Sequence, residues 1–249
     1  MKTLSAVLLS TLISTGFSAA AAAESISLFT TQYPPYTMTT SGEPFAHKAS
    51  DIDGLCTAIV KHLFAEADVD YTMRLRNWSY GMQRVQKRSS HGLFCTVRTA
   101  EREKLFQWVG PITEMKGALF AASGSSIEID NLEDARQYRI GGFRGDFFSE
   151  YLIAKGFDID TPPSDAQNPK RLKIGAIDLW ISDAIVGPYM ASDMADMPDI
   201  ENKFVFTNNA VYLAISVDTP KEAVRKLQST LDRLRKSGEL VALEQSYGL

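Results

Sequence analysis

Residues 94–112 read F-C-T-V-R-T-A-E-R-E-K-L-F-Q-W-V-G-P-I, and they are the segment from which the fold and the site are predicted. The apolar residues 92–97 have the length and the β-branched and aromatic content of a strand. The charged residues 99–104 predict the start of a helix, and a second apolar run completes the segment. This order places two arginines, Arg98 and Arg102, just beyond the end of a strand.

Either arginine could receive a carboxylate. A guanidinium offers a planar fork of donors that matches both carboxylate oxygens, and free backbone N–H groups at a strand end can share the anion. The alternative is a solvated turn on which Arg98 and Arg102 pair with Glu101 or Glu103. The segment alone leaves both interpretations open.

The composition indicates an ordinary globular protein. With 249 residues, the chain can form one large domain or two of ordinary size. It is 45% hydrophobic and 22% charged, with a net charge of −4 and no basic cluster, which argues against a nucleic-acid partner. His47, His62 and His91 show no ligand spacing, so we expect no metal and no cofactor.

The first residues predict a signal peptide over residues 1–23. A positive start precedes an apolar stretch at 4–17 and a small-residue region at 19–23, so cleavage is expected after Ala23. We therefore predict an exported, periplasmic protein. Elsewhere the sequence has no stretch of about 18 uncharged apolar residues, so no membrane span is expected.

Two cysteines, Cys56 and Cys95, would then lie in an oxidising compartment. One is expected on a helix and the other on a strand. We favour two separate, buried thiols over a disulfide, which would need the two Cα atoms within about 7 Å of each other.

The rest of the chain alternates predicted strands and helices at the spacing of βαβ units, which indicates a mainly parallel sheet. Strands are predicted at residues 26–32, 71–75, 92–97, 117–122, 138–143, 178–182, 204–207 and 211–216. Helices are predicted at residues 53–67, 79–88, 147–155, 167–174, 184–193, 220–236 and 238–247. Two α/β units follow from this layout.

Ligands of open α/β sheets bind beyond the carboxyl ends of the strands. Three groups follow such ends, at residues 32–36, 97–102 and 143–147, and Asp183 is a fourth. We predict that these groups converge on one binding site.

Residues 25–249 resemble the bacterial extracellular solute-binding proteins of the polar amino-acid type, family 3. The resemblance rests on the order and spacing of several segments. These are Y-P-P-Y at 33–36, D-G-L-C-T-A-I-V at 53–60, Trp78 followed by a helix, T-A-E-R at 99–102 with W-V-G-P-I at 108–112, I-G-A-I-D-L-W-I-S-D at 174–183, and a C-terminal helix with L-R-K-S-G-E-L.

The resemblance implies an α/β, two-lobed periplasmic-binding-protein fold of type II. Each lobe would be a mainly parallel sheet flanked by helices, and two hinge strands would join them. Lobe 1 would be discontinuous, at residues 24–114 and 208–249, and lobe 2 would be residues 115–207. Hinge closure around a ligand in the cleft is the expected motion.

The resemblance also implies roles for individual residues. The ligand carboxylate would be held by Arg102 and by backbone amides near Gly145, and the ligand ammonium by Asp183. Tyr33 would cover the ligand. The full set of predicted ligand-binding residues is Tyr33, Tyr36, Trp78, Thr96, Arg98, Arg102, Gly145, Asp146, Phe147 and Asp183.

The sequence departs from the family pattern at the site. Of the hydroxyl residues expected before T-A-E-R only Thr96 is left, and Asp146 and Phe147 replace a Ser or Thr pair after Gly145. The Asp146 carboxylate would repel an anionic group unless a cation such as Arg144 lies beside it. The ligand is therefore expected to be an amino acid or a cationic, larger or modified relative of one.

The resemblance implies a monomeric binding protein, not an enzyme, that delivers a small polar solute to an ABC permease. One alternative is an enzyme like the periplasmic cyclohexadienyl dehydratases, with Asp146, Asp183 or Glu114 as the proton donor. The other alternative is a sensory protein that docks on a receptor.

Overall fold

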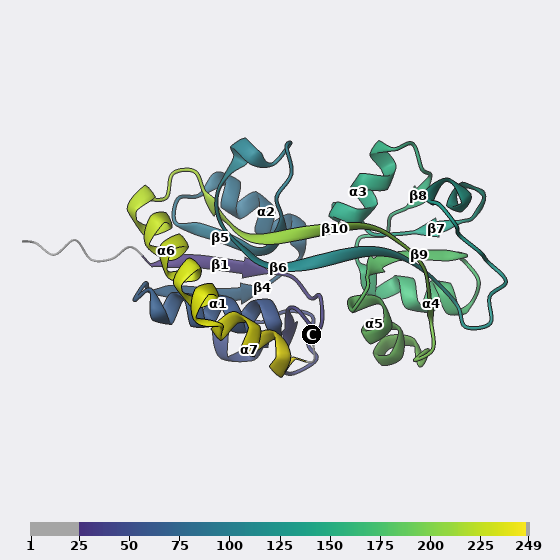
Figure 1. Ribbon diagram of the computed structural model, residues 1–249, viewed down its shortest axis with the longest axis horizontal. Helices are drawn as coiled ribbons and strands as arrows, with labels where there is room; N and C mark the ends of the chain where they lie inside the picture. Colours follow the sequence, from purple (N-terminus) through teal and green to yellow (C-terminus); the bar gives the residue numbers. More distant parts are fainter. Residues whose placement is uncertain (1–24, 248–249) are drawn as a thin grey trace, which may run out of the picture.

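Two long strands connect two groups of helices in the computed structural model, which describes residues 25–247 (Figure 1). The predicted signal peptide at residues 1–23 therefore lies outside the described residues. The long strands are β6 (Phe106–Ala121) and β10 (Glu201–Ser216), which pair antiparallel along their length. They lie in the middle of one eight-stranded sheet with the order β4-β1-β5-β10-β6-β9-β7-β8.

The first lobe holds the three strands that pair on the β10 side of the sheet. β1 (Ile26–Thr30) lies parallel between β4 (Tyr71–Leu75) and β5 (His91–Val97), and β5 pairs with β10. Its other elements are β2 (Met38–Thr39), η1 (Ala49–Asp51), β3 (Ile52–Asp53), α1 (Leu55–Glu66), α2 (Trp78–Lys87), η2 (Glu103–Leu105), α6 (Lys221–Ser237) and α7 (Glu239–Ser246).

The second lobe forms on the β6 side of the sheet. β9 (Leu179–Asp183) pairs with β6 and is parallel to β7 (Ile140–Gly141), which pairs in turn with β8 (Ile159–Asp160). Its other elements are η3 (Leu132–Gln137), α3 (Phe147–Ala154), η4 (Asp165–Gln167), α4 (Asn168–Lys173) and α5 (Val186–Ala195).

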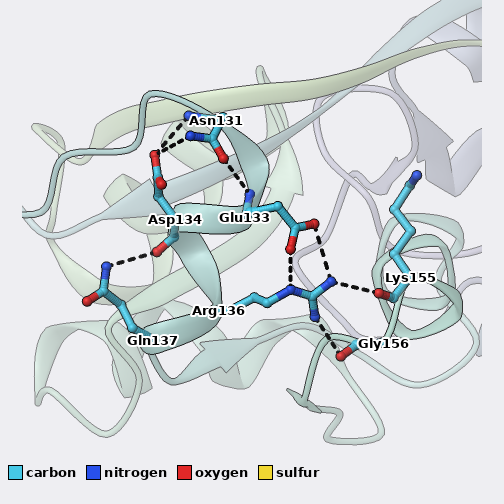
Figure 2. Close-up of polar contacts among 7 residues, drawn as sticks. All are labelled: Asn131, Glu133, Asp134, Arg136, Gln137, Lys155 and Gly156. Atoms are coloured by element: carbon cyan, nitrogen blue, oxygen red, sulfur yellow. Dashed lines mark hydrogen bonds and ion pairs between the residues drawn. The ribbon is translucent and has the colours of Figure 1, made fainter.

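A polar cluster fixes the far end of α3 to η3 (Figure 2). Arg136 donates to the backbone oxygens of Gly156, at 2.7 Å, and of Lys155, at 2.8 Å, and it pairs with Glu133. The last carbonyls of a helix lack partners within the helix, so Arg136 supplies donors just beyond the carboxyl end of α3. The same cluster holds the capping box formed by Asn131 and Asp134 at the start of η3. The cluster therefore helps to hold α3, whose opposite end lies at the site described below.

The predicted alternation of strands and helices is confirmed, but two predictions about these elements need correction. The apolar runs predicted as separate strands in residues 117–122, 204–207 and 211–216 are parts of β6 and β10. Pro111 does not interrupt β6. Val211 pairs with Thr113 and Leu213 with Val109, and the register between these pairs is irregular. Pro111 lies in this irregular step, where the ladder needs no N–H from it. The helix start predicted at residues 99–104 is wrong: one short 3-10 turn, η2, is found there.

Cys56 and Cys95 form a disulfide, with their Cα atoms 6.2 Å apart. The preference for two separate thiols was wrong, because α1 packs against the sheet and brings its first turn beside the end of β5. The predicted lobe boundaries, near residues 114 and 208, fall inside the continuous strands β6 and β10 and remain a prediction. In residues 25–247 no helix has the length and apolar character to span a membrane.

Candidate functional site

A small cavity of about 50 Å³ is lined by residues from both lobes. Its wall is largely aromatic. The six rings that line it are Tyr33, Trp78, Phe94, Phe143, Phe147 and Phe148. Two charged residues, Arg102 from the first lobe and Asp146 from the second, belong to the same wall.

Arg102 follows β5 on a turn in which its backbone N–H donates to the backbone oxygen of Thr99 at 3.1 Å. Its side chain donates one hydrogen bond, from Nη1 to the backbone oxygen of Val97 at 3.3 Å, and no other among residues 25–247. The guanidinium lies 5.8 Å from the centre of the Trp78 ring. Burial lowers the pKa of Arg102, while the charge of Asp146 opposes that change. A guanidinium has five N–H donors, so Arg102 keeps donors for a ligand.

Asp146 is the N-cap of α3. Its Oδ2 accepts from the backbone N–H of Ser149 at 2.9 Å and from the Ser149 hydroxyl at 3.1 Å. Burial raises the pKa of the Asp146 carboxyl to about 6, although the bonds from Ser149 and the charge of Arg102 act in the opposite direction. Gly145, just before it, has φ of +75°, a left-handed conformation that suits glycine. This turn brings Asp146 and Phe147 to the cavity.

Tyr33 bridges the two lobes. Its ring centre lies 6.5 Å from those of both Tyr36, in the first lobe, and Phe143, in the second. Burial and the nearby charge of Asp146 raise the pKa of the Tyr33 hydroxyl. Tyr36 lies behind Tyr33, only 1% exposed, and its hydroxyl donates to the backbone oxygen of Glu114 at 3.2 Å.

The structure places five of the predicted residues on the wall of this cavity: Tyr33, Trp78, Arg102, Asp146 and Phe147. A sixth, Gly145, lines a second hollow beside the cavity, which is described below. The structure does not bring Tyr36, Thr96, Arg98 or Asp183 to the cavity. Arg98 donates to both carboxylate oxygens of Glu103, at 2.7 and 2.6 Å, and is exposed. The alternative interpretation, in which the arginines of this turn pair with neighbouring glutamates, therefore applies to Arg98 but not to Arg102.

Both carboxylate oxygens of Asp183 accept hydrogen bonds from backbone N–H groups. Its Oδ2 accepts from the N–H of Lys116 at 2.7 Å, and its Oδ1 accepts from that of Ile185 at 2.9 Å and that of Val186 at 3.3 Å. These bonds tie β6 to the segment that leads into α5. Thr96 is likewise used internally, because its hydroxyl donates to the backbone oxygen of Leu93 at 3.0 Å.

Several lining residues were not predicted. Thr30 is the last residue of β1 and Thr31 follows it, so the rule about strand ends could have included them. Phe94 and Cys95 lie within β5, and Cys95 has φ of +59°, which no sequence pattern indicated.

A second, larger hollow of about 450 Å³ adjoins the cavity and shares Trp78 and Phe143 with it. Residues of both lobes line this second hollow, including Arg76, Arg144 and Asp165. Asp165 begins η4 and was not among the predicted residues.

Within 25–247 no group of three or more His, Cys, Asp or Glu side chains could hold a metal ion.

A cleft between two α/β lobes joined by paired crossover strands defines the class of periplasmic binding proteins. The chain belongs to the bacterial extracellular solute-binding proteins, family 3, whose family model matches residues 27–249. Comparison with curated proteins gives no match.

Solved structures share the fold at low sequence identity. A histidine kinase sensor domain with similarity to periplasmic binding proteins has a TM-score of 0.79 and 19% identity, covering 90% of this chain and 95% of that one. The arginine-, lysine-, histidine-binding protein ArtJ from Geobacillus stearothermophilus has a TM-score of 0.75 and 16% identity, covering 90% and 95%. An ancestral amino-acid-binding protein, a precursor of cyclohexadienyl dehydratase, has a TM-score of 0.73 and 17% identity, covering 90% and 94%. The predicted two-lobed fold is confirmed.

Proposed function

We propose that this protein captures a small carboxylate-bearing solute, an amino acid or a related compound, in the cavity between its lobes and delivers it to an ABC permease from the periplasm. One observation carries the proposal. Arg102 lines the cavity, yet a single backbone oxygen accepts from its guanidinium among the described residues. A half-buried cation with free donors is a suitable receptor for a carboxylate.

The surroundings of Arg102 favour a solute with an apolar or flat body. The aromatic rings of the wall can cover such a body and strengthen charge interactions by excluding water. Since Asp183 is occupied by backbone donors, Asp146 is the carboxylate that an ammonium group in this cavity would meet. ArtJ is described as binding arginine, lysine and histidine, which supports an amino-acid ligand.

Lobe closure would complete the site. The rings of Tyr33 and Phe143 face each other across the cleft with their centres 6.5 Å apart, so a ligand between the lobes contacts both and binds the closed form more tightly than an open one. A permease or a receptor can then recognise the closed shape.

The test is a thermal-shift screen over amino acids, simple carboxylates and small amines, followed by calorimetry on each hit. A ligand that binds the native state raises Tm. Arg102→Ala should remove the shift given by any carboxylate hit, because it removes a charge-assisted pair worth about 1.5–3 kcal/mol. The matched control is Arg98→Ala, which removes an exposed arginine of the same segment and should keep the shift. Equal shifts in both variants would contradict the proposal.

A second candidate is a dehydratase-like enzyme, which the raised pKa of Asp146, about 6, favours. A carboxyl with a pKa of about 6 is protonated in part just below neutral pH, and this proton can be donated to a leaving hydroxyl. Of the three acids considered from the sequence, Asp146 alone lines the cavity. Formation of an aromatic product from prephenate or arogenate, abolished by Asp146→Asn, would establish this candidate, and absence of turnover would reject it.

A further inference from the structure

Asp165 is a buried carboxylate with one oxygen used and one free. It is 6% exposed. Its Oδ1 accepts from Trp180 Nε1 at 2.8 Å and from Asn168 Nδ2 at 2.9 Å. Its Oδ2 is buried and has no hydrogen-bond partner among residues 25–247. The two bonds to Oδ1 therefore fix the carboxylate in place and leave the second oxygen unsatisfied.

No cation compensates this carboxylate. Asp165 forms none of the ion pairs found within residues 25–247. Arg76 lines the same hollow but donates to the backbone oxygens of Ala46 at 2.8 Å and Leu75 at 2.6 Å. Arg144 lines it too, with an exposed side chain. Burying a carboxylate without a partner is unfavourable, so a cation that reaches Oδ2 would be stabilised.

The position of Asp165 connects it to the first cavity. It lines the second hollow, which shares Trp78 and Phe143 with the cavity that holds Arg102. Burial raises the pKa of Asp165, and the charge on Asp146 raises it further, so the two carboxyls lie within electrostatic range of each other. A ligand anchored at Arg102 can therefore extend past Trp78 toward Asp165.

We propose that Asp165 is a specificity-determining cation subsite, which receives an alkylammonium or guanidinium group at the far end of the solute whose carboxylate Arg102 holds. The inference rests on the proposed function and narrows its substrate class to solutes with a distal organic cation. In this arrangement Arg102 binds the carboxylate of the solute, and Asp165 discriminates between solutes by their distal group.

The primary test compares L-lysine with L-norleucine by isothermal titration calorimetry. These amino acids share the carboxylate and the α-ammonium, and only lysine carries the distal ammonium. Because a hydrogen bond to a charged group is involved, the native protein should bind lysine roughly tenfold or more tightly than norleucine. Asp165→Asn should bring the two affinities to within about twofold. Asp158→Asn removes one exposed carboxylate from the same lobe and should preserve the native ratio.

A second variant guards against misfolding of Asp165→Asn. Ala166 is exposed and lines the same hollow, so Ala166→Lys leaves the core unchanged and places an ammonium beside Asp165. It should also remove the preference for lysine. The inference would be overturned if the native protein bound lysine and norleucine with nearly equal affinity. It would also be overturned if both variants kept the preference of the native protein for lysine.

A probe without a carboxylate separates this inference from the proposed function. 1,4-Diaminobutane should bind the native protein and the Arg102→Ala variant, and it should lose binding in Asp165→Asn. If Arg102→Ala leaves norleucine binding unchanged while Asp165→Asn abolishes diaminobutane binding, the proposed carboxylate receptor fails and the cation subsite stands. Absence of binding by both lysine and diaminobutane overturns the cation subsite.

Discussion

Removal of the disulfide between Cys56 and Cys95 should lower the free energy of unfolding by about 4 kcal/mol. The two cysteines are 39 residues apart in sequence. For a closed loop of about 40 residues, the chain-entropy relation gives roughly 13 cal/mol/K, or about 4 kcal/mol near room temperature. The bridge fixes the start of α1 to the end of β5, and Cys95 itself lines the cavity.

The assay is urea unfolding of the native protein and of the double variant Cys56→Ala/Cys95→Ala, followed by fluorescence. A reducing agent should lower the stability of the native protein to that of the variant and leave the variant unchanged. The urea dependence should also become steeper in the variant, since an uncrosslinked unfolded chain exposes more surface. A loss below about 1 kcal/mol, or a native protein insensitive to reduction, would refute the reasoning.

Three further perturbations have defined outcomes. Burial raises the pKa of Asp146 to about 6 and that of Asp165 to about 7. Both carboxyls therefore bind protons more tightly in the folded chain than in the unfolded chain. Their ionisation lowers the stability of the fold as pH rises from about 4 to about 7. Asp165→Asn should therefore flatten the fall in Tm over that range, and an unchanged pH profile would show that the pKa is not raised. Arg136→Ala should lower the free energy of unfolding, measured in urea, because carbonyls beyond the end of α3 lose charged donors. Gly187→Ala should cost about 1–3 kcal/mol in the same assay, because a Cβ there would lie 2.6 Å from Phe120 Cε2, and a neutral result would contradict the packing.

The sequence predicted much of the fold because its signals are local. Apolar periodicity and turn residues located most helices and the short parallel strands. The continuity of β6 and β10 could not be predicted in this way, because it depends on pairing between residues about a hundred positions apart, such as Glu114 with Ala210. The disulfide depends on the same kind of long-range contact.

The site was predicted in part for a similar reason. The rule about strand ends located Tyr33, Arg102 and Asp146. It could not show that Asp183 accepts from the backbone of Lys116, which is 67 positions away in sequence but lies on the neighbouring strand β6. Nor could it separate Arg102 from Arg98, since the pairing of Arg98 with Glu103 is a matter of side-chain direction. Asp165 was missed because it is defined by an unused oxygen rather than by a motif.

The most direct test of the carboxylate receptor is a crystal structure of the protein with a carboxylate hit from the thermal-shift screen. The proposal predicts that both oxygens of the ligand carboxylate lie within about 3 Å of the Arg102 guanidinium, with the body of the ligand between Trp78 and the rings of the second lobe. A carboxylate bound at Arg98, at Arg144 or outside the cavity, with Arg102 untouched, would contradict it.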